Sequence, residues 1–176
     1  MQYARTAASL AAMLMLPAVA AAEVKMATPE GALIEHRFRI AATPEAAWQV
    51  LVHPERYWPK EHTWSGDAAN LSMAPEAGGC FCERWDGGSA EHGRIVMARP
   101  GKLLRFRGSL GPFQEMAVTG VLTVSLSPVE SGTEAVVTYR LSGDPSHKLD
   151  SFITVVDQVV GLQFGGFARL ASTPPR

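Results

Sequence analysis

Apolar and polar positions alternate through most of this 176-residue chain. In the stretch LIEHRFRIAA, Ile34, His36, Phe38 and Ile40 fall on one side, and charged residues fall on the other. A period of two is typical of a half-buried β-strand. Turn-forming stretches such as PEAGG, DGGS and RPGK separate further segments of this kind. The sequence predicts strands over residues 34–40, 69–74, 79–85, 90–98, 102–108, 117–127 and 133–141.

Two helical regions interrupt the strands. The stretch TPEAAWQVLV begins with Thr43 as N-cap and Pro44 at the first helical position, and PERYWP continues as a second short helical piece. From about Ser146 to Ala171, apolar residues recur at steps of three and four, which predicts one long amphipathic helix capped by Ser146. This helix contains three glycines, Gly161, Gly165 and Gly166. One interpretation is that they let a ligand or another backbone segment approach the helix closely. The other is that they allow tight packing of the helix on the sheet.

The order of these elements indicates the fold class. A strand, two short helices, six strands and a long helix follow one another along the chain. Consecutive strands joined by short turns favour antiparallel neighbours, so the class is α+β with a single antiparallel sheet. One helix lying along a strongly curved sheet does not fill the space beneath it. The sequence therefore predicts a hollow between the sheet and the C-terminal helix.

The first residues differ from the rest of the chain. A short positive region at Arg5, the apolar run AASLAAMLML and a series of small residues predict a signal peptide cut after Ala22 or, alternatively, after Ala20. A membrane anchor is the other interpretation, but the run is shorter than the ~20 residues that span a bilayer. We therefore expect a periplasmic or secreted protein with no membrane span in the mature chain. The expected parts are a signal peptide (1–22), an N-terminal extension (23–32), one domain (33–172) and a short tail (173–176).

Composition and motifs exclude several functions. A formal charge of −1, with no run of Lys or Arg, makes nucleic acid an unexpected partner. The chain has no glycine-rich phosphate loop after a strand, and GGSAE around Ser89 lacks the closing glycine of a nucleophile elbow. We therefore expect no cofactor. The cysteines and histidines are the remaining candidates for chemistry.

Residues 33–171 resemble the helix-grip proteins of the START and Bet v 1-like superfamily, also called SRPBCC or polyketide-cyclase/Hsp90-activator-like proteins. The resemblance rests on FRIAATPEAAWQVLVHPERYWP, GGCFCERW, GRIVMARPGKLLRF and VVDQVVGLQFGGFARL. The stretches HTWSGDAANL, GSAEHGRIV and LGPFQEMAVTG are similar to an exported bacterial subgroup of unsettled function. The resemblance implies a strongly curved antiparallel sheet of about seven strands around a long C-terminal helix. It implies a ligand cavity between them but no particular reaction.

Cys80 and Cys82 are the only cysteines, and they lie two positions apart in a predicted strand. Residues i and i+2 of a strand are ~6.5 Å apart, whereas a disulfide needs Cβ atoms within about 4.5 Å. Unless a bulge folds the strand back, the two cannot bridge, and we expect two free thiols that pack as small apolar residues. Redox chemistry is one alternative. A zinc or copper site that adds His92 and His62 is another, but no metal is expected because the second half of a zinc motif is missing.

The register of the hairpin between residues 79 and 98 decides what His92 faces. A three-residue loop over 86–88 places Cys82 opposite His92, and a two-residue turn at 87–88 places Glu83 there. A Glu83–His92 pair lining the hollow would act as a polar anchor or as a general acid and base. A purely structural pair is the alternative.

These observations predict an exported protein that binds a hydrophobic or amphipathic small molecule, such as a lipid, between the sheet and the C-terminal helix. One alternative is a cyclase- or hydrolase-type enzyme that uses His92 with Glu83 or His62. Another is a metal-binding variant, and a third is a module that binds a protein client. The candidate ligand-binding residues are Trp48, His62, Trp64, Phe81, Glu83, His92, Phe106, Tyr139, Phe152, Val156, Val159 and Gln163.

Overall fold

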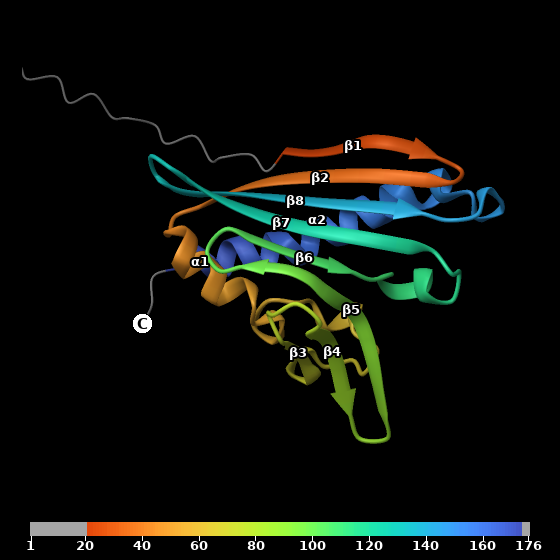
Figure 1. The fold of residues 1–176 in the computed structure, drawn as a ribbon, viewed down its shortest axis with the longest axis horizontal. Coiled ribbons are helices and arrows are strands. Elements are labelled where there is room, and N and C mark those ends of the chain that lie inside the picture. Colours follow the sequence, from red (N-terminus) through yellow and green to blue (C-terminus); the bar gives the residue numbers. More distant parts are fainter. Residues whose placement is uncertain (1–20, 174–176) are drawn as a thin grey trace, which may run out of the picture.

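The computed structural model describes residues 21–173. An eight-stranded antiparallel sheet curves along one long C-terminal helix, α2 (Leu149–Ala171), with the shorter helix α1 (Pro44–Leu51) at one end of it (Figure 1). This arrangement confirms the predicted α+β helix-grip fold. All but the last two residues of the predicted signal peptide lie outside the described residues. The strands are β1 (Ala21–Thr28), β2 (Gly31–Ile40), β3 (Leu71–Met73), β4 (Cys80–Trp85), β5 (Gly88–Arg99), β6 (Leu103–Arg107), β7 (Thr119–Val129) and β8 (Gly132–Ser142).

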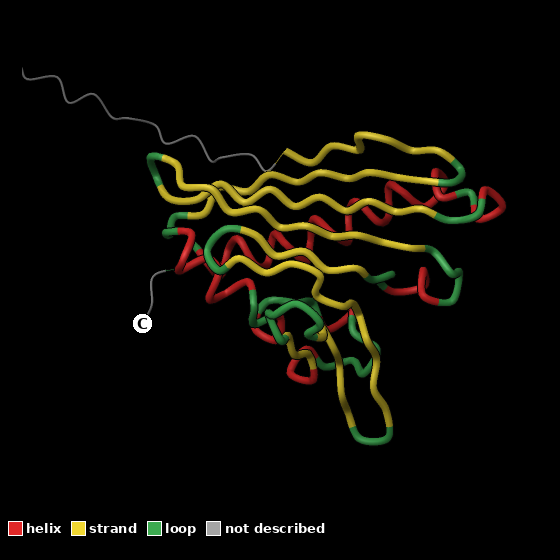
Figure 2. Tube along the Cα trace, in the orientation of Figure 1, coloured by secondary structure: helices red, strands yellow, loops and turns green. Residues whose placement is uncertain are grey.

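The strand order in the sheet is β1-β2-β8-β7-β6-β5-β4-β3. Strands β3 to β8 follow one another as antiparallel neighbours, as short turns require. Strand β2 joins this series by pairing with β8, and the β4–β5 hairpin extends beyond the rest of the sheet (Figure 2). Within the described residues, the connections contain five short 3₁₀ helices, at Pro54–Arg56, Lys60–His62, Ala68–Asn70, Gly111–Gln114 and Pro145–His147.

The pattern analysis missed strand β1. Residues Ala21–Thr28 pair with residues 31–37 of β2, with a register shift between Val24 and Met26, and most of them belong to the segment that we expected to be an N-terminal extension. The stretch AAEVKMAT does alternate, since Val24 and Met26 fall between the charged residues Glu23 and Lys25. This alternation is short and adjoins the predicted cleavage site, and the strand forms on the edge that β2 offers to it.

The long helix begins three residues later than predicted. Ser146 does not cap it, because residues Pro145–His147 form a 3₁₀ turn in which Asp144 accepts a hydrogen bond from the Ser146 amide. Lys148 then adopts a left-handed conformation with φ of 50°, which ends the turn before α2 starts at Leu149. At α1, by contrast, the predicted cap is confirmed, since Oγ1 of Thr43 accepts from the amide of Ala46.

Two glycines of α2 serve close packing. A Cβ built on Gly166 would lie 2.6 Å from the backbone oxygen of Tyr57, and one built on Gly161 would lie 3.0 Å from Cε1 of His36. His36 itself is buried, and its Nε2 lies 2.9 Å from Oδ1 of Asp157 on α2. The small residues therefore let the helix approach both the sheet and the α1 region.

Helix α2 is the one helix among residues 21–173 that is long and apolar enough to cross a membrane. Its inward residues are packed in the core, where Ile153, Val160, Phe164 and Phe167 are buried. Together with buried aromatic and aliphatic residues from the inner face of the sheet, they form one hydrophobic cluster. This is the environment of a core helix, and packing on the sheet accounts for the buried part of its apolar composition.

Candidate functional site

A cavity of about 350 Å³ opens between α2, the sheet and two connecting loops. One loop follows α1 and carries Trp58 and residues 61–64, and the other precedes β7 and carries residues 110–113 and Met116. The volume is within the range of small-molecule sites, and most of the lining is apolar. The lining residues are Trp58, Glu61, His62, Thr63, Trp64, His92, Leu110, Gly111, Pro112, Phe113, Met116, Tyr139, Phe152, Val155, Val156, Val159, Val160 and Gln163.

Tyr139 on β8 holds the second loop in place. Its hydroxyl group donates to the backbone oxygen of Gly108 over 3.2 Å and accepts from the amide of Leu110 over 3.1 Å. Burial raises the pKa of Tyr139 to about 12, so the phenol is neutral at physiological pH. Since both hydrogen bonds go to the protein, this side chain contributes mainly its ring to the cavity.

Glu83 on β4 is the most fully enclosed charged group at the site, with no exposed surface. Its carboxylate accepts hydrogen bonds from the amides of Trp64 (3.0 Å) and Ser65 (2.6 Å) and from Nε2 of His92 (2.9 Å). Burial alone would raise the pKa of Glu83, but the hydrogen bonds from Ser65, the Trp64 amide and His92 outweigh it and lower the pKa below its ordinary value. The side chain is therefore an anion that holds the first loop and His92 together.

His92 reaches Glu83 because the hairpin contains a bulge. Phe81 pairs with Gly93 and Cys82 pairs with Glu91, so His92 is an extra residue on β5 without a cross-strand partner. The turn itself consists of Asp86 and Gly87, so neither expected register is right. Glu83 pairs with Ala90, and the bulge is what turns the imidazole toward the carboxylate. The expected Glu83–His92 pair therefore forms, although the strand register differs from both registers that we expected.

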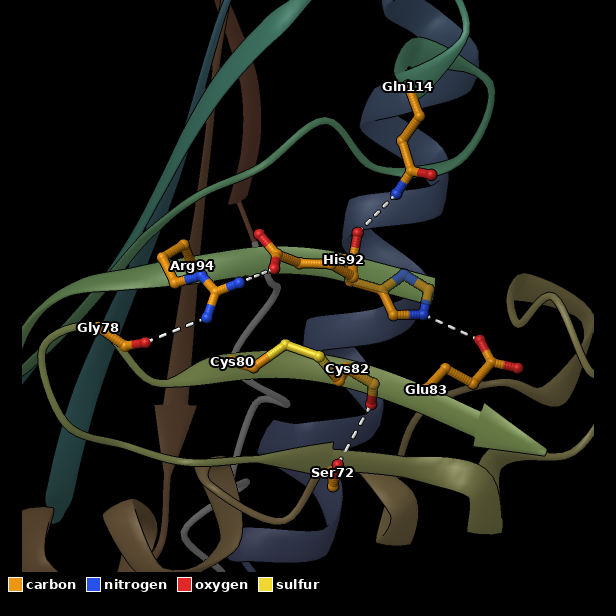
Figure 3. Close-up of a disulfide and its surroundings, with 9 residues drawn as sticks. Ser72, Gly78, Cys80, Cys82, Glu83, His92, Arg94 and Gln114 are labelled. Carbon is orange, nitrogen blue, oxygen red and sulfur yellow. Dashed lines mark hydrogen bonds and ion pairs between the residues drawn. A yellow bond between two sulfur atoms is a disulfide. The ribbon is translucent and has the colours of Figure 1, made fainter. Parts of the chain in front are cut away.

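The two cysteines form a disulfide, and our expectation of two free thiols is wrong. Their Cα atoms are 5.4 Å apart, about 1 Å closer than two residues of an extended strand. Residues 80–82 of β4 face residues 91–94 of β5, so the contracted strand lies opposite the bulge (Figure 3). We had excluded a bridge unless a bulge was present. A bulge is present, but its extra residue lies on the neighbouring strand β5.

This bridge also overturns the metal-binding alternative. Disulfide sulfurs are not thiolates, so Cys80 and Cys82 cannot act with His92 and His62 as soft metal ligands. Among residues 21–173, no group of three or more His, Cys, Asp or Glu side chains is arranged to hold a metal ion. The surroundings of the bridge are polar, because Arg94 donates to the Gly78 backbone oxygen over 3.2 Å and pairs with Glu91.

The structure divides the candidate ligand-binding residues into two groups. The first group lines the cavity, and it consists of His62, Trp64, His92, Tyr139, Phe152, Val156, Val159 and Gln163. The second group lies in the core behind the lining and is buried, and it consists of Trp48, Phe81, Glu83 and Phe106. Phe81 separates the lining from the core, since its ring contacts those of Trp58, His92 and Phe106.

Sequence reasoning missed the loop before β7. Leu110, Phe113 and Met116 line the cavity although they belong to no regular strand. The stretch LGPFQEMAVTG carried the signal, because apolar residues in a glycine- and proline-containing connection have to be covered by another part of the molecule. Phe113 is buried and lies edge-on to Phe152 of α2, with ring centroids 6.5 Å apart.

No protein-family model and no curated protein matches this chain. Solved structures of similar shape include a structural-genomics protein from Rhodobacter sphaeroides (19% identity, 85% of this chain and 97% of that one, TM-score 0.57). CalU16 from Micromonospora echinospora is also similar (16% identity, 89% and 86% covered, TM-score 0.56). So is StfQ, a di-domain aromatase/cyclase of the steffimycin biosynthetic pathway (17% identity, 82% and 50% covered, TM-score 0.57). At these identities the likeness concerns the fold alone, and it agrees with the helix-grip fold described above.

Proposed function

We propose that this chain is an exported protein that binds a hydrophobic or amphipathic small molecule in the cavity between the sheet and α2. The observation that carries the proposal is the largely apolar lining, which has only a few polar groups at fixed positions. Apolar lining supplies affinity through the burial of ligand surface, and the few polar groups fix its orientation. Aromatase/cyclase proteins such as StfQ share the fold, which agrees with a role in handling small molecules.

The proposal includes export of the protein from the cytoplasm. The first 22 residues have the sequence pattern of a signal peptide. A disulfide between Cys80 and Cys82 suits an oxidising compartment such as the periplasm or the extracellular medium. Mass spectrometry of the protein recovered from the periplasm tests this directly. Export is contradicted if the chain is found in the cytoplasm with residues 1–22 still attached.

The binding proposal is tested with 1-naphthylamine, a neutral probe of two fused rings whose fluorescence depends on the polarity of its surroundings. The variant Val159→Phe places a larger side chain in the cavity and is expected to weaken probe binding about 10-fold or more. The control Leu162→Phe makes the same kind of change on α2 at a side chain that is 56% exposed and does not line the cavity. Equal probe binding by both variants, or no binding by the unmodified protein, would refute the proposal.

A second function is favoured by the hydrogen bond between His92 and Glu83. A buried carboxylate that orients an imidazole beside a cavity is an arrangement used for general acid–base catalysis. If the chain is a hydrolase, it cleaves an aryl ester such as 2-naphthyl acetate, and His92→Asn slows this reaction about 100-fold or more. If it is a carrier, the ester binds without being cleaved.

A further inference from the structure

Gln163 on α2 has a polar atom that the protein itself leaves without a partner. The side chain lines the cavity and is only 3% exposed, and its Oε1 accepts no hydrogen bond from any described residue. Buried carbonyl groups in folded proteins nearly always have a partner. Nε2 of Gln163 likewise makes no hydrogen bond with any described residue, so the amide group as a whole is placed to form hydrogen bonds with a bound molecule.

His92 contributes a second polar group at the same cavity. The ionised carboxylate of Glu83 can only accept, so Nε2 of His92 donates their hydrogen bond. Nδ1 of the ring makes no hydrogen bond with any described residue. Nδ1 and the Gln163 amide, which can both donate and accept, are therefore two hydrogen-bonding partners for a hydroxyl group, which also does both.

The charges around the cavity disfavour anions. No Lys or Arg is among the lining residues, whereas the carboxylate of Glu61 is, and the ionised Glu83 lies directly behind His92. A carboxylate or phosphate entering this site would lose its water without meeting a fixed cation. The same move costs a neutral hydroxyl group little once it forms a hydrogen bond with Gln163 or His92.

The volume limits the size of the molecule. An engineered cavity of ~150 Å³ holds one benzene ring. A cavity of about 350 Å³ therefore has room for about two fused rings with small substituents, before any movement of the loops.

We infer that the cavity takes a neutral alcohol or phenol of about two fused rings, which forms hydrogen bonds with Gln163 and His92, and that it rejects carboxylates and phosphates of the same size. This inference rests on the proposed small-molecule binding. Beyond that proposal, it names the chemical class of the ligand, and it assigns Gln163 and His92 as the residues that determine specificity.

Three probes of nearly equal shape test it: naphthalene, 2-naphthol and 2-naphthoate. At about pH 7.5 the phenol is neutral and the carboxylic acid is ionised. We expect 2-naphthol to bind about 10-fold more tightly than naphthalene and 2-naphthoate to bind more weakly than either, as measured by titration calorimetry. The inference is overturned if 2-naphthoate binds as well as 2-naphthol, or if 2-naphthol shows no advantage over naphthalene. If none of the three binds, the binding proposal itself fails instead.

The variant Gln163→Met tests whether Gln163 causes the preference for 2-naphthol over naphthalene. It keeps the length of the side chain and removes the amide group. We expect it to reduce the advantage of 2-naphthol over naphthalene about 3-fold or more while naphthalene binding stays as it was. Gln158→Met makes the same change at an exposed position of α2 outside the lining and should keep the full advantage. An undiminished advantage in Gln163→Met would contradict the role of Gln163. The ranking of the probes in the unmodified protein tests the inference even if this variant does not fold.

Discussion

His92 donates from Nε2 to Oε2 of Glu83 over 2.9 Å, although the two residues are not cross-strand partners. The contact exists because His92 is the extra residue of a bulge, which turns its ring out of the regular alternation of β5. Glu83 binds the amides of the 64–65 segment with the same carboxylate. One buried anion thus positions both the histidine and a loop of the cavity, and it is a positioning residue for the site.

Replacing Glu83 tests this role. Glu83→Ala leaves two amides and an imidazole without their acceptor in the interior, so we expect the free energy of unfolding to fall by about 3 kcal/mol or more. Urea denaturation measures the loss. The control Glu134→Ala removes a carboxylate whose ion pairs with Arg37 and Arg39 are partly exposed at the surface, and it should cost about 1 kcal/mol or less. Equal losses in the two variants would contradict the positioning role.

The lowered pKa of Glu83 predicts acid sensitivity. Because the folded-state pKa lies below the unfolded one, the unfolded chain binds more protons in the window between the two values. The stabilisation by Glu83 is therefore fully present above about pH 4.3 and is lost as the pH falls through the folded-state value. Unfolding free energies measured against pH should fall more steeply below this point in the native protein than in Glu83→Gln. Parallel curves would show that Glu83 has the same pKa in both states.

The disulfide is expected to matter more for local geometry than for global stability. It closes a loop of only three residues, so the double variant Cys80→Ser/Cys82→Ser should lose only about 1–2 kcal/mol of unfolding free energy. Without the bridge β4 can extend, which removes the reason for a bulge opposite it. We expect the imidazole resonances of His92 in NMR spectra to shift on adding a dithiol reductant, but not in the double variant. Free thiols in the untreated protein, seen as the mass of two additional hydrogens, would contradict the bridge.

Two adjacent glycines of α2 offer a matched comparison. A methyl group at Gly166 meets the fixed backbone oxygen of Tyr57 at 2.6 Å, so Gly166→Ala should destabilise the fold by about 1–3 kcal/mol despite the better helix propensity of alanine. At Gly165 the nearest atom is the flexible end of Arg169 at 3.3 Å. Gly165→Ala should therefore be neutral or stabilising by up to about 1 kcal/mol. Thermal unfolding distinguishes the two, and a stabilised Gly166→Ala would contradict the close contact.

Much of the fold was predictable because its signals are local. The alternation of Ile34, Phe38 and Ile40 was sufficient for β2, and Thr43 with Pro44 located the start of α1. Strand β1 was missed although Val24 and Met26 lie between charged residues, because this alternation is short and the strand depends on an edge supplied by β2. The start of α2 was not predictable in this way, since it depends on the left-handed conformation of Lys148.

The site was predictable only in part, and the cysteines show why. Cys80 and Cys82 carry the same spacing whether their strand is extended or contracted, so spacing alone favoured free thiols. The choice depends on how residues 80–82 align with 91–94, which is a property of two strands together. Likewise, the sequence located Gln163 on the long helix, but only packing showed that its oxygen lacks a partner.

By itself, the sequence determined the type of each main element except β1, the α+β class and the presence of one long apolar helix, because periodicity and turn chemistry act between near neighbours. The tertiary structure decided the hairpin register, the bulge at His92, the disulfide and the group of residues that lines the cavity. These features arise where segments distant in sequence meet, and a shift of one residue in their alignment turns side chains to the opposite face.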